Sequence, residues 1–405
     1  MEPRQLRGAE IAESGGLQTK GRHLWLVPSQ SHTGKWLVDY SSGDPTCTCP
    51  DYEANSAFCK HIFAIEIQEG RLSISEPTPK KKTYTQDWPA YNAAQTNERP
   101  HFVRLLRDLC DGIVMPVQKG RGRPKIPLSD VVFACTMKVY EGTSGRRASS
   151  EIQRCLEEGF LTKAPSYNTI SDYLLRPDLT PLLRTLVQES ASPLAGIEGK
   201  FATDSTGFGT TTYDRWFDQK WGRFRNRAVF VKSHICCGTL THIVTDMIVS
   251  PRGDAVEFTP LLDATSQRFS IESVSADKAY SSKANLAAVD ALGAVAYIPF
   301  KDGTKGGKQD LWSRMYHYYR YKRDDFNAHY HDRSNVETVF SMVKAKFDQK
   351  VRSKSPEAQT NEVYCKFLCH NIVVLVLSIY ELGLVPEFWR PGAPAGLPLP
   401  AVKGA

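Results

Sequence analysis

Four residues near the end of the chain combine a carboxylate with groups that bind phosphate: Tyr330, Arg333, Glu337 and Lys344. On a single α-helix of 3.6 residues per turn, their spacing places them within an arc of about 60°. Valines and a phenylalanine of the same segment fall on the neighbouring face, which can pack on a core. The carboxylate can hold a metal ion, while the arginine and the lysine can hold phosphates. The spacing therefore predicts a helix suited to metal-dependent chemistry on a polynucleotide.

Two aspartates are candidates to join this helix, because metal-assisted phosphodiester cleavage needs several converging carboxylates. Asp204 ends the strand-like run KFATD, directly before Ser-Thr-Gly, and Asp277 ends the run IESVSAD, directly before a helix. A side chain at a strand end can project from the edge of a sheet. We therefore select Asp204, Asp277 and Glu337 as the candidate acidic triad. Other aspartates of the region rank lower, several of them because they fit a helix cap or a helix interior: Asp246, Asp254, Asp263 and Asp290.

A second chemical motif lies near the start of the chain, behind the strand-like runs HLWLVP and KWLVDY. It consists of Cys47, Cys49, Cys59 and His61, within fifteen residues of sequence. Three thiolates and one imidazole form a tetrahedral zinc set, and four protein ligands leave no position for a reacting water. The pattern Cys-x-Cys, gap, Cys-x-His resembles the SWIM zinc finger over about residues 20–70. This resemblance implies an accessory module that binds DNA or protein around a structural Zn²⁺.

The middle of the chain contains a short basic segment, Lys119–Lys125, with Arg121 and Arg123 in the sequence Arg-Gly-Arg-Pro. It resembles the core of an AT-hook, whose arginines lie in a narrow minor groove of DNA. An ordinary basic linker is an equally good interpretation.

Two helices are predicted after this segment, over residues 148–159 and 166–175, with Ser166 as the N-cap of the second. As a helix-turn-helix, the pair would present Tyr167, Asn168 and Thr169 to base edges. An ordinary helical subdomain explains the same pattern.

The elements that must position the triad begin near residue 199, where a helical pattern changes to strands. We predict a mixed α/β region, because runs with strand character are followed by alternating helices and strands. The predicted strands cover 201–207, 227–237, 241–250, 271–277 and 294–300, and the predicted helices between them cover 256–269 and 283–293.

Composition is that of a soluble multidomain protein without an export signal. The chain has 405 residues, 41% hydrophobic and 23% charged, with a net charge of +7. From residue 301 to 354 there are 13 Lys/Arg against 7 Asp/Glu, so the basic excess surrounds the candidate helix and favours a polyanionic partner. The most apolar run, residues 372–379, is far shorter than the roughly 20 residues of a membrane span. Ten cysteines without a signal segment indicate a reducing compartment.

Together, these motifs resemble the ribonuclease H-like core of DDE transposases over about residues 196–385. The Tyr330, Arg333, Glu337 and Lys344 spacing matches the Y-(2)-R-(3)-E-(6)-K signature of insertion-sequence transposases, and residues 276–280 (ADKAY) are similar to their second-aspartate motif. The resemblance implies Mg²⁺- or Mn²⁺-dependent cleavage at the ends of a mobile element and joining of the freed 3′-OH to target DNA. It implies that the triad holds the metals and that Tyr330, Arg333 and Lys344 contact DNA-end phosphates.

The resemblance also implies double-stranded DNA as partner, a homodimer or larger synaptic complex, and a cytoplasmic, nucleoid-associated protein of a prokaryote. The short interval between Asp277 and Glu337 leaves little room for the large β insertion of some relatives. Two other interpretations stay open, an inactive descendant that regulates by binding DNA and a nuclease that does not transpose.

The predicted fold class is α/β: a ribonuclease H-like mixed sheet flanked by helices, preceded by a small zinc-binding ββα module and a helical domain. The predicted boundaries are 1–75 for the finger, 76–125 for a basic linker, 126–195 for the helical region, 196–385 for the catalytic domain and 386–405 for a disordered tail.

Overall fold

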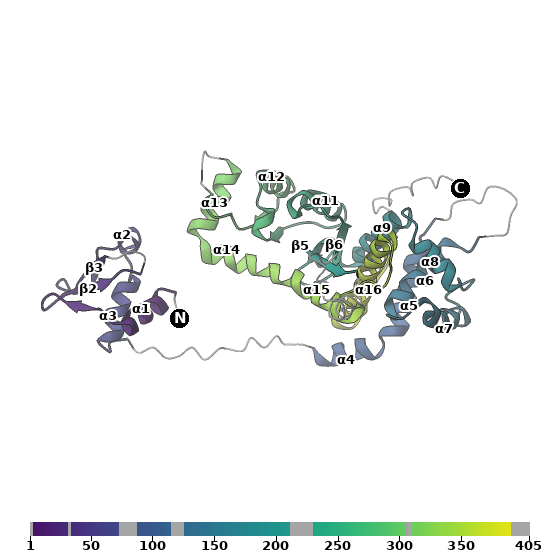
Figure 1. Ribbon diagram of the computed structural model, residues 1–405, viewed down its shortest axis with the longest axis horizontal. Coiled ribbons are helices and arrows are strands. Elements are labelled where there is room, and N and C mark those ends of the chain that lie inside the picture. The colour runs from purple at the N-terminus through teal and green to yellow at the C-terminus, as the bar shows by residue number, and fades with distance from the viewer. Residues whose placement is uncertain are drawn as a thin grey trace, which may run out of the picture. The chain divides into compact units, whose positions relative to one another are not determined.

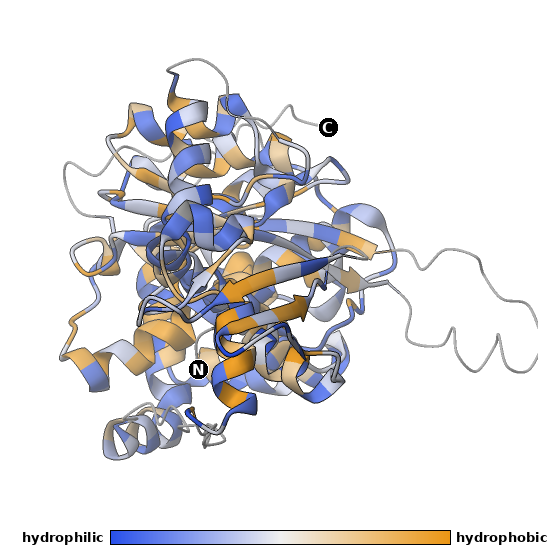
Figure 2. Ribbon diagram, turned by 90° about the vertical axis from the view of Figure 1, so that its left-hand side faces the viewer, coloured by the Kyte–Doolittle hydropathy of each residue, from blue (hydrophilic) through white to orange (hydrophobic). Residues whose placement is uncertain are grey.

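A computed structural model describes residues 3–30, 34–72, 87–114, 125–210, 230–304, 306 and 310–389 (Figure 1). The chain forms two units, residues 1–85 and 86–405. Most helices and strands carry hydrophobic residues beside hydrophilic ones, so each can bury one side and expose another (Figure 2).

The first unit is a small antiparallel sheet with helices. Its sheet has the order β1-β2-β3-β4, and Trp25 of β2 lies opposite Val38 of β3. The predicted ββα module is present, and α1, β1 and β4 add to it. A Cβ at Gly8 of α1 would lie 2.7 Å from the Cβ of Phe63 in α3, so glycine permits the close packing of these two helices. The elements are α1 (Pro3–Ser14), β1 (Gln18–Thr19), β2 (Leu24–Pro28), β3 (Lys35–Asp39), β4 (Thr46–Cys47), α2 (Pro50–Asn55) and α3 (Lys60–Gln68).

The second unit begins with a helical region. Its helices bury their apolar faces in one continuous core that extends to the sheet behind them. The predicted helix pair is present as α7 and α8, and Ser166 caps α8 by accepting a hydrogen bond from the Thr169 amide at 3.2 Å. The helices are α4 (Trp88–Thr96), α5 (Glu98–Asp111), α6 (Leu128–Tyr140), α7 (Gly145–Glu157), α8 (Tyr167–Leu174), α9 (Leu179–Ala191) and the 3₁₀ turn η1 (Ser192–Leu194).

The second part of this unit is a five-stranded mixed sheet of order β7-β6-β5-β8-β9. Strands β5, β6 and β7 are antiparallel, whereas β8 and β9 run parallel to β5. The mixed sheet and flanking helices confirm the predicted α/β class. The elements are β5 (Lys200–Gly209), β6 (Phe230–Gly238), β7 (Val244–Val249), α11 (Asp254–Ser266), β8 (Ser273–Ala276), η2 (Lys278–Tyr280), α12 (Lys283–Ala291), β9 (Val295–Tyr297), α13 (Leu311–Tyr321), α14 (Arg323–Tyr330), η3 (His331–Arg333), α15 (Ser334–Phe347) and α16 (Pro356–Leu382).

Helix α16 lies between the sheet and the helical region and packs on both (Figure 1). Of the helices described, this one is long and apolar enough to cross a membrane, yet 78% of its most apolar window is buried inside the fold. It also buries Lys366, His370 and Asn371. Burial on all sides is typical of a central core helix, as predicted for its apolar run.

The end of the described chain is anchored. The Trp389 indole Nε1 donates to the Leu109 carbonyl at 2.9 Å, and its backbone amide donates to Glu189 at 2.7 Å. Residues 386–389 therefore belong to the fold, although the predicted tail began at residue 386. The remaining sixteen residues of the predicted tail, 390–405, lie outside the described residues.

Candidate active site

The two candidate aspartates stand next to each other on neighbouring parallel strands. The register pairs Thr203 of β5 with Ala276 of β8, and this is the last pair of the ladder. Asp204 and Asp277 are the residues that follow on each strand, so both lie where the two strands separate. The expectation that Asp204 ends its strand was wrong, because β5 continues to Gly209 by pairing with β6. Only the parallel pairing ends there, and this opening of the sheet exposes the carboxylates.

Glu337 lies on α15, near Asp204, because Arg333 pairs with both carboxylates. Residues 323–347 form α14, η3 and α15 in direct succession, with helical backbone angles through the junction. Val336, Val339 and Val343 are fully buried, so the apolar face docks on the core and leaves the polar face toward β5.

Arg333 joins two members of the triad. Its Nη1 lies 3.0 Å from Asp204 Oδ2, and its Nη2 lies 2.5 Å from Glu337 Oε1. The guanidinium thus neutralises carboxylates from two distant parts of the sequence. The sequence predicted contact of Arg333 with DNA phosphates; in the structure of the chain alone its partners are the two carboxylates.

The surroundings of Asp204 raise the pKa of its carboxyl group. Burial raises the pKa of Asp204, and the negative charges of Asp277 and Asp254 raise it further. The Ser205 amide, which donates to Asp204 Oδ1 at 2.8 Å, and the Arg333 guanidinium act in the opposite direction. Asp277 accepts a hydrogen bond from the Ala279 amide at 2.7 Å, which orients it at the start of η2. A divalent cation would relieve the repulsion among these carboxylates.

Lys344 and Tyr330 flank the acidic group. The Lys344 ammonium donates to Thr206 Oγ1 at 2.6 Å, and burial lowers the pKa of Lys344. Tyr330 is partly buried against the Phe326 ring, with ring centroids 6.0 Å apart, and burial raises the pKa of its hydroxyl. Arg333 and Lys344 contact β5 and Glu337 lies between them on α15, whereas Tyr330 is the last residue of α14; the 3₁₀ turn η3 divides the predicted single helix.

The far end of α15 is held by Lys366 of α16. The buried ammonium donates to three carbonyl oxygens, those of Phe347, Asp348 and Lys350, at 2.6, 2.7 and 2.7 Å. The same loop adds to the end of β5, where the Val351 amide donates to the Gly209 carbonyl at 2.9 Å. Lys366 thereby fixes the helix of Glu337 against the strand of Asp204. No sequence pattern signalled this role, because its acceptors are backbone atoms.

Replacing Lys366 with methionine is expected to lower the free energy of unfolding of the second unit by about 3 kcal/mol, because three carbonyls lose their buried donor. Urea denaturation followed by circular dichroism measures the change. Lys354→Met, at an exposed position of the same loop, is the control and should change stability little. Equal stability of the two variants would show that the buried ammonium does not support this loop.

The lower-ranked aspartates have different surroundings. Asp246 is buried in β7, where it pairs with Arg184 at 2.5 Å and accepts from Gln188 at 2.8 Å, so it joins the sheet to α9. Asp263 and Asp290 are exposed on α11 and α12. Asp254 is the first residue of α11, with Gly253 as N-cap, and lies close enough to Asp204 for its charge to act on it.

The aromatic residues before the triad helix pack on the protein. The rings of Trp312, Tyr316 and Tyr319 surround Phe300 at centroid distances of 4.8, 5.4 and 5.7 Å. These contacts hold the three rings against the core. The described residues between β9 and α15 form helices and no strand, as expected for a chain without a large β insertion.

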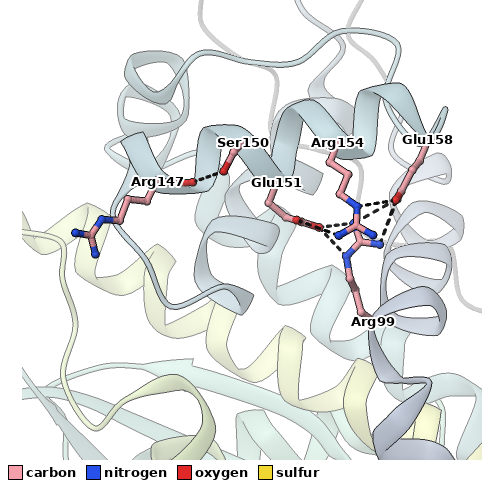
Figure 3. Close-up of polar contacts among 6 residues, drawn as sticks. All are labelled: Arg99, Arg147, Ser150, Glu151, Arg154 and Glu158. Atoms are coloured by element: carbon pink, nitrogen blue, oxygen red, sulfur yellow. Dashed lines mark hydrogen bonds and ion pairs between the residues drawn. The ribbon is translucent and has the colours of Figure 1, made fainter.

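An ion network connects α7 to α5. Arg99 of α5 lies between Glu151 and Glu158 of α7, and Arg154 pairs with Glu158 at 2.9 Å (Figure 3). Arg147 lies apart from this network and points away from it (Figure 3). This network fixes α7 on α5.

The outer side of the helix pair carries polar and basic groups. Tyr167 and Asn168 are exposed at the start of α8, and Thr169 is half-buried. The Arg146 guanidinium lies over the Tyr167 ring, 5.2 Å from its centroid, as in a cation–π contact. Arg121 and Arg123, the AT-hook-like pair, lie outside the described residues.

The four predicted zinc ligands meet in the first unit. One ligand atom from each of Cys47, Cys49, Cys59 and His61 lies within 4.8 Å of the others, and all four residues are buried. His61 Nδ1 is 3.8 Å from the sulfurs of both Cys47 and Cys59. Ligand bonds of about 2.3 Å to sulfur and 2.0 Å to nitrogen produce separations near this length in a tetrahedron. The cluster therefore fits a structural zinc ion.

The acidic group fits a different metal. Asp204, Asp277 and Glu337 offer hard carboxylate oxygens and no sulfur or nitrogen, which suits Mg²⁺ or Mn²⁺. The buried hydroxyl of Tyr280 beside them has no hydrogen-bond partner among the described residues, which marks polar space next to the carboxylates. The residues present thus fit a divalent cation site.

Two family models match the chain. Residues 196–372 match the transposase DDE domain, and residues 36–70 match the SWIM zinc finger. The first match contains the whole acidic triad, and the second contains all four zinc ligands. Comparisons with curated proteins and with solved structures found no match.

Proposed function

Because the chain carries a transposase DDE domain and a SWIM zinc finger, we propose that it is a DNA transposase that cleaves the ends of a mobile element and joins the freed 3′-OH to target DNA. The observation that supports this most is the meeting of Asp204, Asp277 and Glu337 at the point where β5 and β8 separate, with Arg333 between two of them.

The three carboxylates would hold two Mg²⁺ or Mn²⁺ ions. When bound, such ions activate the attacking hydroxyl and stabilise the leaving oxygen. The ends of the β5–β8 pairing would supply two of the ligands, Asp204 and Asp277, and α15 would supply the third. Their positions are fixed by the strand register at one side and by Lys366 at the end of α15.

The basic side chains around the triad would bind the DNA. Lys344 lies beside Thr206, two residues beyond Asp204 on β5, and would contact a phosphate near the cleaved bond. Arg333 and Tyr330 would contact the DNA end in the same way. In the helical region, Arg146, Arg147 and Tyr167 would meet the duplex farther from the triad, with the zinc finger as an accessory that binds DNA or protein.

In the DNA-free chain the Arg333 guanidinium is paired with Asp204 and Glu337. A DNA phosphate that binds Arg333 would free both carboxylates for a metal ion, so bound DNA should strengthen metal binding and bound metal should strengthen DNA binding. Arg333→Gln is expected to raise the Mn²⁺ affinity of the DNA-free protein on the order of tenfold, because a cation leaves the ligand oxygens. Isothermal titration calorimetry with Mn²⁺ measures this change. Arg320→Gln, at an exposed arginine of α13, is the control. Unchanged or weaker Mn²⁺ binding in Arg333→Gln would contradict the idea that Arg333 and the metal ion compete for the carboxylates.

A DNA-binding regulator without catalysis is the second candidate, since it would keep the basic surface without needing the triad. An assay with a plasmid that carries the element ends and Mg²⁺ distinguishes the two. Excision and strand-transfer products support the transposase, cleavage alone supports a nuclease, and binding without products supports the regulator.

A further inference from the structure

A partly buried polar cluster lies beside Asp204, outside the acidic triad. It is formed by Lys232 and His234 of β6, Asp254 of α11 and Tyr280 of η2. His234 Nδ1 and the Tyr280 hydroxyl are buried without a hydrogen-bond partner among the described residues, while Asp254 Oδ1 forms an ion pair with the Lys232 ammonium. Buried polar atoms are normally paired, so two unpaired ones in a single place call for an explanation.

Asp254 contacts β6, the strand that pairs with the strand of Asp204. Its Oδ1 lies 2.8 Å from the Lys232 ammonium and 3.3 Å from His234 Nδ1. In the β5–β6 register, His234 is the partner of Ser205, which directly follows Asp204. Burial has the largest single effect on the pKa of Asp254 and raises it. Lys232 and a hydrogen bond with Ser205 together outweigh burial, so the pKa of Asp254 is lowered. Asp254 is therefore a carboxylate located next to the first aspartate of the triad.

The His234 ring does not supply Asp254 with an ordinary hydrogen bond. Its Nε2 lies 3.2 Å from the Ser250 carbonyl oxygen, which can only accept, so Nε2 carries the proton. In the neutral ring Nδ1 is then an acceptor that faces the Asp254 oxygen, another acceptor. Two acceptors that face each other repel. In the metal-free chain the positive charge of the Lys232 ammonium relieves this repulsion.

Tyr280 closes the cluster from the side of Asp277. Its side chain is 1% exposed, and its ring packs on Phe258 of α11 at 5.7 Å. Asn285 donates to the carbonyls of Tyr280 and Ala255, at 2.8 and 3.2 Å, and so holds the turn after Asp277 against the start of α11.

The Tyr280 hydroxyl is a buried donor on which the charges of three aspartates act. Burial raises the pKa of Tyr280, and the charges of Asp204, Asp254 and Asp277 raise it further. An unpaired buried donor among acids marks the space as polar and suited to ligand oxygens.

We propose that Asp254 is a fourth carboxylate of the divalent-cation site, which is then built from β5, β8, α15 and the start of α11. This inference rests on the proposed function. Lys232 would neutralise Asp254 before a metal ion binds, and Arg333 would do the same for Asp204. The ligand class is a hard divalent cation, Mg²⁺ or Mn²⁺, because the donors are carboxylate oxygens.

The first test measures Mn²⁺ binding to the full chain without DNA by isothermal titration calorimetry. Asp254→Asn is expected to weaken binding about tenfold or to remove one ion per chain. Asp263→Asn, at an exposed position of the same helix, is the matched control and should bind as the unaltered protein does. Equal binding by the two variants overturns the proposal.

Asp204→Asn separates this proposal from the function on which it rests. If Asp204→Asn loses Mn²⁺ and Asp254→Asn does not, the triad site stands and the fourth carboxylate is rejected. If neither substitution changes Mn²⁺ binding, the cation site itself is rejected.

A second test needs no variant, which matters if Asp254→Asn fails to fold. Fe²⁺ is bound in place of Mg²⁺, and ascorbate with hydrogen peroxide generates hydroxyl radicals that cleave the backbone near the metal. Cleavage near residues 204, 277, 337 and 254, suppressed by excess Mg²⁺, supports the proposal. Cleavage near the first three positions without cleavage near 254 overturns it.

Discussion

Asp204→Asn, Asp277→Asn and Glu337→Gln should each reduce Mg²⁺-dependent cleavage of element-end DNA by roughly a thousandfold or more, since metal-assisted hydrolysis depends on correctly placed anionic ligands. Each substitution keeps the shape of the side chain and removes its charge. Binding of the same DNA should change by no more than a few fold, because phosphate contacts come from the basic side chains. A gel assay with a labelled end fragment measures cleavage, and a mobility-shift assay measures binding.

The control for these variants is Asp263→Asn, an exposed carboxylate of the same unit, which should cleave normally. Thermal unfolding of each variant shows whether the fold is kept. Full cleavage by any one of the three variants would remove that residue from the triad. Loss of both cleavage and DNA binding with a lowered melting temperature would point to a role in folding instead.

Zinc removal is expected to unfold the first unit, the other large effect. Its core is small, with about nine buried apolar residues that include three of the zinc ligands. Binding of structural zinc contributes about 10–16 kcal/mol to folding in comparable fingers, far more than such a core. A chelator, or Cys47→Ser combined with Cys49→Ser, should make residues 3–72 sensitive to proteolysis and leave the second unit intact.

Metal analysis provides the complementary measurement. We expect about one zinc ion per chain in the unaltered protein and none in the double variant. Cys155→Ala is the matched control, because Cys155 is a buried, free cysteine of the second unit and no zinc ligand. Equal zinc content in the double variant and in this control would reject the Cys47–His61 cluster as the zinc site.

Local signals carried most of what the sequence could predict. The zinc ligands lie close in sequence, so their spacing alone defined the cluster. The cap of α8 was recognisable because Ser166 acts on the amide three residues on. The face shared by Tyr330, Arg333 and Glu337 follows from helical periodicity, which any sequence displays directly.

Contacts between distant segments were beyond such signals. The position of Asp204 inside a longer strand depends on pairing with β6. The role of Lys366 depends on backbone carbonyl groups at the end of α15 that have no partner within the helix. Asp254 ranked low because a residue after glycine at a helix start usually caps the helix. Asp254 lies near Asp204 because α11 packs against β5 and β6, and the spacing of residues in the sequence does not reveal this packing.

The position of α16 has a consequence for the DNA that this protein would process. One helix packs on β6 and β7 of the sheet and on α5, α6, α8 and α9 of the helical region, so both parts share a single core. If α7 and α8 bind the element end as proposed, their distance from the carboxylates is set by the protein. The second unit would then fix the number of base pairs between the recognised sequence and the cleaved bond, and this number would be the same at both element ends.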